Sequence, residues 1–189
     1  MDEIKKRADV VACFLTRRCT ALYDVPSAEC VALQIRKILE LIALASLVAN
    51  KAEYAAMHAK FEEHWKAKEI LDNIREINPK FYPVPTMQHR REDGIFDNQP
   101  VKTGFLTADN FKTLYDQCSK LLHVRNPFSK KAAGDAKRFL KDAAQWMNRI
   151  RVLLNHHEII LAGRDQLIIC LMRSEDDGQP HAALFELVK

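Results

Sequence analysis

Two charged residues lie one helical turn apart inside the most apolar stretch of the chain, Ser27 to Asn50. Arg36 and Glu40 are four residues apart, so both side chains leave the same face of a helix. A carboxylate among leucines and isoleucines needs a partner, because an unpaired buried charge is costly. The pair therefore indicates either a structural ion pair or a site whose guanidinium holds a phosphate or another oxyanion.

A second polar group ends a later helical pattern, in the stretch Leu-Leu-His-Val-Arg-Asn-Pro-Phe. Here His123 can act as a general acid or base, and Asn126 supplies an amide. If the two helices are neighbours, we expect these residues to join Arg36 and Glu40 in one catalytic site. The alternative is a buried ion pair beside a histidine that ends a helix.

A third set lies at the end of the last long helical pattern, where Arg151 precedes His156 by five residues. An arginine followed after four to six residues by a histidine resembles the signature of the HEPN superfamily, which comprises metal-independent ribonucleases and related binding proteins of bacterial defence and toxin systems. The resemblance implies that Arg151 and His156 act on the scissile phosphate and the RNA 2′-hydroxyl, usually across a homodimer. Val152 departs from the family pattern, which usually has a polar residue there.

A wider resemblance covers roughly residues 27–156. An Arg-x-x-x-Glu inside an apolar second helix, followed by a helix that ends in Leu-His and a turn, is similar to HEPN-like domains that have lost the arginine-histidine motif, and to uncharacterised bacterial and prophage-borne proteins. It implies a protein that binds or cleaves RNA in a defence or counter-defence system. No metal or cofactor is expected.

Two other functions stay open at this point. The first is a non-enzymatic interaction module, such as an inhibitor, adaptor or assembly subunit, that binds another protein through the edge of the C-terminal strands or through the proline-rich loop at residues 79–85. The second is a small-molecule sensor with a pocket over Arg36.

Several classes of protein are disfavoured by what the sequence lacks. It has no Gly-x-Gly-x-x-Gly or Walker-type loop, no His-Glu-x-x-His and no Gly-x-Ser-x-Gly, and only 5 glycines in total. These absences argue against Rossmann enzymes, zinc proteases and hydrolases. The longest apolar run is about half of the ~20 residues that a membrane span needs, so we expect a cytoplasmic protein without membrane contact. The 5 cysteines include no Cys-x-x-Cys pair, and we expect reduced core residues.

Charge permits nucleic-acid binding without requiring it. The net charge is +4, and basic residues cluster around Arg17 and Arg18 and again between Arg125 and Arg138. A solvated helix face explains each cluster equally well.

The elements that must position these residues are mainly helical. We expect a first helix over residues 2 to about 23, and a central helix capped by Ser27 that continues or restarts after a bend near Asn50. Later helices begin at Thr107 or Asp109 and at Ser129 or Asp135. A short hairpin is expected around Asp93-Gly94.

The last residues switch to strand periodicity. The predicted class is therefore α+β, mainly α: an up-and-down helical bundle over residues 1–157, with a loop or hairpin excursion at 79–106, and a C-terminal antiparallel meander over 158–189 packed on the helices.

Overall fold

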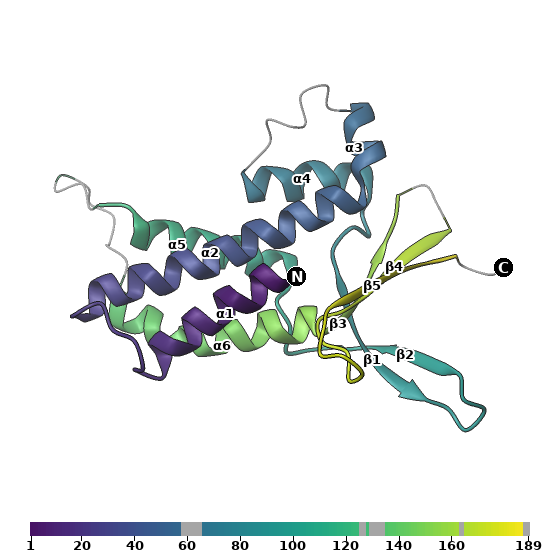
Figure 1. Cartoon of the computed structure of the whole chain (residues 1–189). Coiled ribbons are helices and arrows are strands. Elements are labelled where there is room, and N and C mark those ends of the chain that lie inside the picture. The colour runs from purple at the N-terminus through teal and green to yellow at the C-terminus, as the bar shows by residue number, and fades with distance from the viewer. Residues whose placement is uncertain (58–65, 125–127, 129–134, 163–164, 187–189) are drawn as a thin grey trace. The chain divides into compact units, whose positions relative to one another are not determined.

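The computed structural model describes residues 1–57, 66–124, 128, 135–162 and 165–186 (Figure 1). The chain forms two compact units. Unit 1 comprises Met1–Leu41 and Thr107–Asn148, and unit 2 comprises Ile42–Leu106 and Arg149–Lys189. Two helices, α2 (Asp24–Ala49) and α6 (Ala136–Leu154), pass from one unit into the other.

Unit 1 is built from α1 (Asp2–Leu15), the first part of α2 (Asp24–Ala49), α5 (Ala108–Leu122) and the first part of α6 (Ala136–Leu154). Its core is apolar. Helical spacing predicts a buried face of α2 at Val31, Ile35, Ile38, Ile42 and Ala45. The first three are fully buried in unit 1 and Ile42 is 2% exposed, whereas Ala45 is exposed, so the prediction is wrong at that position. Burial of such side chains contributes roughly 1.5–3 kcal/mol each, so these apolar residues determine which face of α2 packs into the core.

The helix ends differ in part from the prediction. The first helix ends at Leu15, not near Tyr23, and Arg17 takes a left-handed backbone conformation with φ 58°. The prediction that Ser27 caps the central helix is wrong, because α2 begins at Asp24 and the Ser27 hydroxyl accepts a hydrogen bond from Ala21 N at 3.2 Å. The amide nitrogen of a residue in the first turn makes no helical hydrogen bond, so Pro26 is compatible with a helix that begins at Asp24.

Two later helix starts follow the prediction. Thr107 Oγ1 accepts a hydrogen bond from Asn110 N, and Asp135 Oδ1 accepts one from Arg138 N. Each satisfies an amide that the first turn of a helix would leave unpaired.

The expectation that all five cysteines are reduced is also wrong. Cys13 and Cys19 form a disulfide, with their Cα atoms 5.3 Å apart. The early end of α1 and the left-handed Arg17 turn the chain back on itself, and this brings two residues six apart within bonding range. Cys30, Cys118 and Cys170 are free.

Unit 2 contains the rest of α2 and α6, α3 (Lys51–Met57), α4 (Ala67–Ile77) and one antiparallel sheet. The predicted restart of the helix near Asn50 is confirmed. The Asn50 side chain donates to Ser46 O and accepts from Asn78 Nδ2, and Asn78 Nδ2 also donates to Ile160 O at 2.7 Å. Buried amides of this kind are stable only with such partners.

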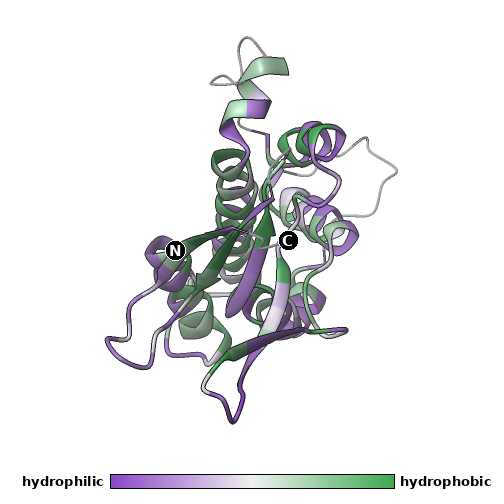
Figure 2. Cartoon of the chain, turned by 90° about the vertical axis from the view of Figure 1, so that its right-hand side faces the viewer, coloured by the Kyte–Doolittle hydropathy of each residue, from purple (hydrophilic) through white to green (hydrophobic). Residues whose placement is uncertain are grey.

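Over the described residues the sheet has five strands in the order β2-β1-β3-β4-β5. They are β1 (Val84–Arg90), β2 (Phe96–Pro100), β3 (His156–Ile160), β4 (Gln166–Leu171) and β5 (His181–Glu186). The hairpin and the meander are therefore both confirmed, and β1 pairs with β3 to join them. In Figure 2 the tip of the hairpin is hydrophilic, whereas hydrophobic colour runs along strands of the sheet. The α+β class is confirmed.

Candidate nucleic-acid interface

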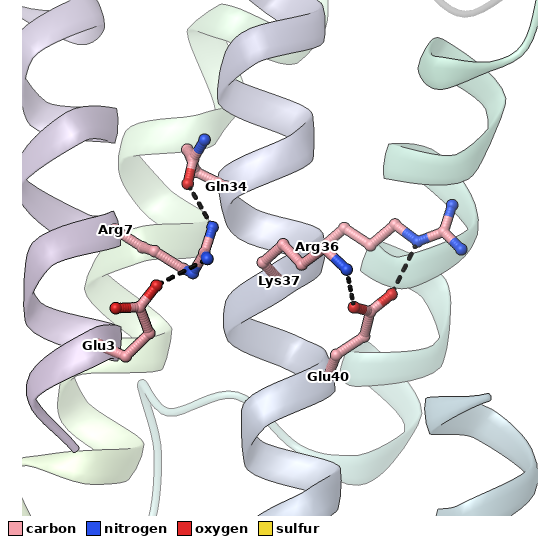
Figure 3. Close-up of polar contacts among 6 residues, drawn as sticks. All are labelled: Glu3, Arg7, Gln34, Arg36, Lys37 and Glu40. Atoms are coloured by element: carbon pink, nitrogen blue, oxygen red, sulfur yellow. Dashed lines mark hydrogen bonds and ion pairs between the residues drawn. The ribbon is translucent and has the colours of Figure 1, made fainter. Parts of the chain in front are cut away.

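Arg36 and Glu40 form the expected ion pair on α2, within unit 1. Arg36 Nε donates to Glu40 Oε1 at 3.2 Å, and Lys37 Nζ contacts Glu40 Oε2 at 2.8 Å (Figure 3). The Glu40 side chain is only 15% exposed. Because both carboxylate oxygens already have cationic partners, Glu40 is poorly placed to orient a histidine.

The guanidinium of Arg36 points towards α5 (Figure 3), where it lies 4.9 Å from the centre of the Tyr115 ring. Burial lowers the pKa of Arg36, but Tyr115 and Glu40 raise it by more, so the net shift is upward. Nearby, burial raises the pKa of Cys118 to about 12 despite the opposing charge of Arg36. The contact of Arg36 with Tyr115 joins α2 to α5, and burial keeps the thiol of Cys118 protonated.

His123 lies apart from this pair. It is the exposed C-cap residue of α5, eight residues beyond Tyr115, which corresponds to about 12 Å along a helix axis. Within the described ranges, no hydrogen bond or ion pair joins His123 to Arg36 or Glu40. Asn126, the fourth residue of the expected set, lies outside the described residues.

Arg151 and His156 belong to unit 2. Arg151 is exposed in the last turn of α6, whereas His156 begins β3 and is 7% exposed. His156 Nδ1 lies 2.7 Å from Thr86 Oγ1 on the neighbouring strand. Burial lowers the pKa of His156, although the charge of Glu158 and a backbone hydrogen bond with Thr86 raise it. The ring is therefore held in place and neutral at pH 7.

The adjacent His157 faces the other side of the sheet. Its Nδ1 donates to Leu154 O at 3.0 Å, and burial lowers its pKa to about 4. A neutral, enclosed imidazole of this kind fills the core and closes the end of α6. Its role is structural.

A polar cluster surrounds His156. Asn98 Nδ2 donates to Glu158 Oε1 at 2.9 Å, and Asn98 Oδ1 is enclosed without a hydrogen-bond partner. His156 Nε2 also has no hydrogen-bond partner among the described residues, but this atom is not fully buried. The cluster can therefore offer the Nε2 atom of His156 to a ligand. No described hydrogen bond joins Arg151 to the cluster.

A cleft in unit 1 gathers basic residues that are distant in the sequence. It encloses about 790 Å³, and its lining includes Arg17 from the α1–α2 turn and Lys137 and Lys141 from α6. The lysines are four residues apart and so share one face of the helix. Among the described residues of the lining the acid is Asp24, which lies 4.0 Å from Lys137, and both side chains are more than half exposed. Such an exposed pair is weak, so the cleft keeps a positive potential.

The wall of this cleft also carries an exposed aromatic ring. Tyr23 is 63% exposed, and it follows Leu22, whose φ of 70° turns the chain just before α2. The disulfide of Cys19 fixes the same turn. The lining of this cleft therefore contains an exposed ring together with three basic residues.

Sequence reasoning found both basic clusters but not their convergence, and it missed Tyr23 and Lys141. The charge of each unit carries a further signal. Unit 1 contains 15 Lys and Arg against 10 Asp and Glu, a net charge of +5, whereas unit 2 contains 14 against 15, a net charge of −1. The whole positive excess of the chain lies in the unit that holds the cleft.

The proline-rich turn before β1 behaves mainly as a connector. Phe81 is 1% exposed, and the Tyr82 hydroxyl donates to Leu106 O at 2.9 Å. Burial raises the pKa of Tyr82, so its hydroxyl keeps this proton. Beside the turn, Pro79, Pro83 and Phe105 contribute to an apolar hollow of about 410 Å³.

Two classes of site are not found. The described part of the chain contains no group of three or more His, Cys, Asp or Glu residues that could hold a metal ion. Among the helices of the same residues, none is both long and apolar enough to cross a membrane.

Comparison of the chain with protein-family models, with curated proteins and with solved structures finds no match. Functional inference therefore rests on the residues and their geometry.

Proposed function

We propose that unit 1 binds single-stranded RNA through the cleft lined by Arg17, Tyr23, Lys137 and Lys141. The observation that carries the proposal is the convergence of three cations from two distant segments on one cleft. Cationic side chains neutralise phosphates and release counterions, and an exposed ring can stack on a base whatever its identity. RNA, rather than another polyanion, is named because of the sequence resemblance to HEPN-like proteins.

The test is a titration of a short labelled single-stranded RNA at low salt, read by fluorescence anisotropy. Charge reversal of both lysines, Lys137→Glu with Lys141→Glu, should weaken binding by about tenfold or more. The matched control is Lys120→Glu together with Lys112→Glu, because these α5 lysines belong to the same unit but are not part of the cleft lining. Equal weakening by both double variants would mean that only net charge matters. A DNA strand of the same sequence, bound equally well, would remove the preference for RNA.

Metal-independent cleavage of that RNA is the finer proposal. It is favoured by His156, whose Nδ1 is held by Thr86 while Nε2 is not enclosed, and by the exposed Arg151 just before it. Labelled RNA should be cut in the presence of a chelator, and Arg151→Ala and His156→Gln should abolish the cutting. His123→Ala tests the other histidine. If the parent chain leaves the RNA intact in the presence of chelator, the cleavage proposal is wrong, but the binding proposal is not affected.

We extend the proposal to the wider biology on the same resemblance: a HEPN-like up-and-down helical arrangement working in bacterial defence or counter-defence. Expression of the chain in a bacterial host with and without phage challenge tests this. Equal plaque numbers for the parent chain and the double lysine variant would count against it.

A non-enzymatic interaction module is the second candidate function. It is favoured by β5, an edge strand whose six residues are all exposed. The RNA titration separates the two functions. A chain that leaves RNA unbound at low salt but associates with protein through β5 supports the interaction module.

A further inference from the structure

The two edges of the sheet differ in how they are protected. At one edge, β2 carries Asp97 and Pro100, and a charge or a proline on an edge strand discourages pairing with another chain. At the other edge, β5 is His-Ala-Ala-Leu-Phe-Glu, and its four middle residues carry neither a charge nor a proline. Leu184 is 59% exposed and Phe185 is 46% exposed. An unprotected apolar edge is a template for strand addition.

The hydrogen-bonding direction of each β5 residue follows from the ladder. Met172 N donates to Asn155 O, and Leu161 N donates to Gln166 O, so the even-numbered residues of β4 bond towards β3. Because bonding alternates along an antiparallel strand, the odd-numbered residues of β4 bond towards β5. In the register of β4 with β5, each odd-numbered residue of β4 lies opposite an odd-numbered residue of β5, so the odd-numbered residues of β5 bond towards β4. The backbone N–H and C=O groups that point outward from the sheet therefore belong to Ala182, Leu184 and Glu186.

A second copy of β5 fits this edge. Two copies related by a two-fold axis perpendicular to the sheet pair antiparallel, and residues opposite each other must lie on the same face. When the axis passes through Leu184, it faces Leu184 of the second copy, and Ala182 faces Glu186 of the second copy. All three outward-pointing residues are then paired. Small Ala183 meets large Phe185 on the other face, and no like charges are opposed.

We infer that the chain forms a homodimer by antiparallel pairing of β5 with β5, with Leu184 on the two-fold axis. The sheet then continues from one copy into the next. The inference deepens the second candidate function by naming its partner, and it does not depend on RNA binding. One strand pair is a small interface, so association is concentration-dependent.

Sedimentation velocity over a range of concentrations tests the dimer with two matched lysine substitutions. The parent chain should shift from monomer to dimer as concentration rises. Leu184→Lys places two like charges opposite each other at the axis and should leave a monomer. Ala182→Lys adds the same charge, but it faces Glu186 of the second copy and should keep or strengthen the dimer. A parent chain that stays monomeric, or equal effects of the two lysines, overturns the inference.

Cysteine cross-linking tests the register independently. Residues at a hydrogen-bonded antiparallel pair have Cα atoms about 5.5 Å apart, within the range for a disulfide. Leu184→Cys should therefore give a covalent dimer on mild oxidation, and Ala183→Cys should not. Cross-linking by Ala183→Cys alone would contradict the assigned axis. RNA binding by the Leu184→Lys variant should equal that of the parent, so failure of either proposal is seen separately.

Discussion

Arg36 holds Glu40 through Nε at 3.2 Å while its guanidinium lies 4.9 Å from the centre of the Tyr115 ring. One side chain thus satisfies a carboxylate on its own helix and covers an aromatic ring on α5. Lys37 provides Glu40 with a second cation. The charged interruption of the apolar α2 therefore has a structural explanation, and it does not require a ligand.

We predict that Arg36 and Tyr115 are energetically coupled. Arg36→Met keeps much of the aliphatic stem and leaves Glu40 paired with Lys37, so it should cost only about 1–2 kcal/mol. A double-mutant cycle with Tyr115→Leu, measured by urea unfolding, should give a coupling energy of about 0.5–2 kcal/mol. Strict additivity of the two substitutions would show that the ring contact contributes nothing.

His157 predicts a loss of stability in acid. Its folded-state pKa of about 4 lies below its ordinary value of 6.5. Between these values the unfolded chain binds a proton that the folded chain does not, so the free energy of unfolding falls as pH falls through this window. Above pH 6.5 the side chain contributes no pH dependence, and at full acidification the loss reaches up to about 3 kcal/mol.

The measurement is urea unfolding of the parent and of His157→Asn at several pH values. Asparagine can donate to Leu154 O but does not titrate, so the variant should lose less stability on acidification. His156, whose pKa is also lowered, leaves a residual slope in both proteins. Parallel curves for parent and variant would contradict the assignment.

The cysteines give a prediction by thiol titration. In denaturant without reductant, the chain should show the three thiols of Cys30, Cys118 and Cys170, and after reduction all five. Without denaturant, Cys118 should react slowly, because burial keeps it as the unreactive thiol. Five reactive thiols before reduction of a protein purified without reductant would rule out the Cys13–Cys19 disulfide.

Tyr23 predicts a stacking contribution to RNA binding. Tyr23→Ala should weaken binding by about 1–3 kcal/mol, and Tyr23→Phe should bind nearly as the parent does. The control variant is Leu33→Ala, because Leu33 is an exposed apolar residue of α2. Phe105→Ala would not serve as a control, because Phe105 lines the apolar hollow of unit 2. Anisotropy titrations at one salt concentration compare the four proteins. Equal losses for alanine and phenylalanine at Tyr23 would exclude stacking.

Local patterns predicted much of the fold. The spacing of Val31, Ile35 and Ile38 identified the buried face of α2, because apolar side chains recurring at helical intervals must share one face. Asp93-Gly94 identified the hairpin, whose turn needs the positive φ of 81° that Gly94 adopts readily.

Features that depend on distant segments were not predictable in this way. The burial of His156 depends on Thr86, seventy residues away, and the basic cleft depends on α6 meeting the α1–α2 turn. The Cys13–Cys19 disulfide requires a left-handed Arg17, which helical periodicity does not reveal. Sequence patterns therefore predict the helices and strands, whereas the packing of distant segments determines which polar residues come into contact.

The central claim is that the cleft of unit 1 contacts RNA phosphates, and the salt dependence of binding tests it most directly. The logarithm of the binding constant falls linearly with the logarithm of salt concentration, with a slope of about −0.7 per neutralised phosphate on a single strand. Replacing Arg17, Lys137 and Lys141 by glutamine should reduce the slope by roughly 2. The same replacement of Lys112 and Lys120 should leave it unchanged. An unaltered slope in the cleft variant, or no RNA binding by the parent chain at low salt, would contradict the account.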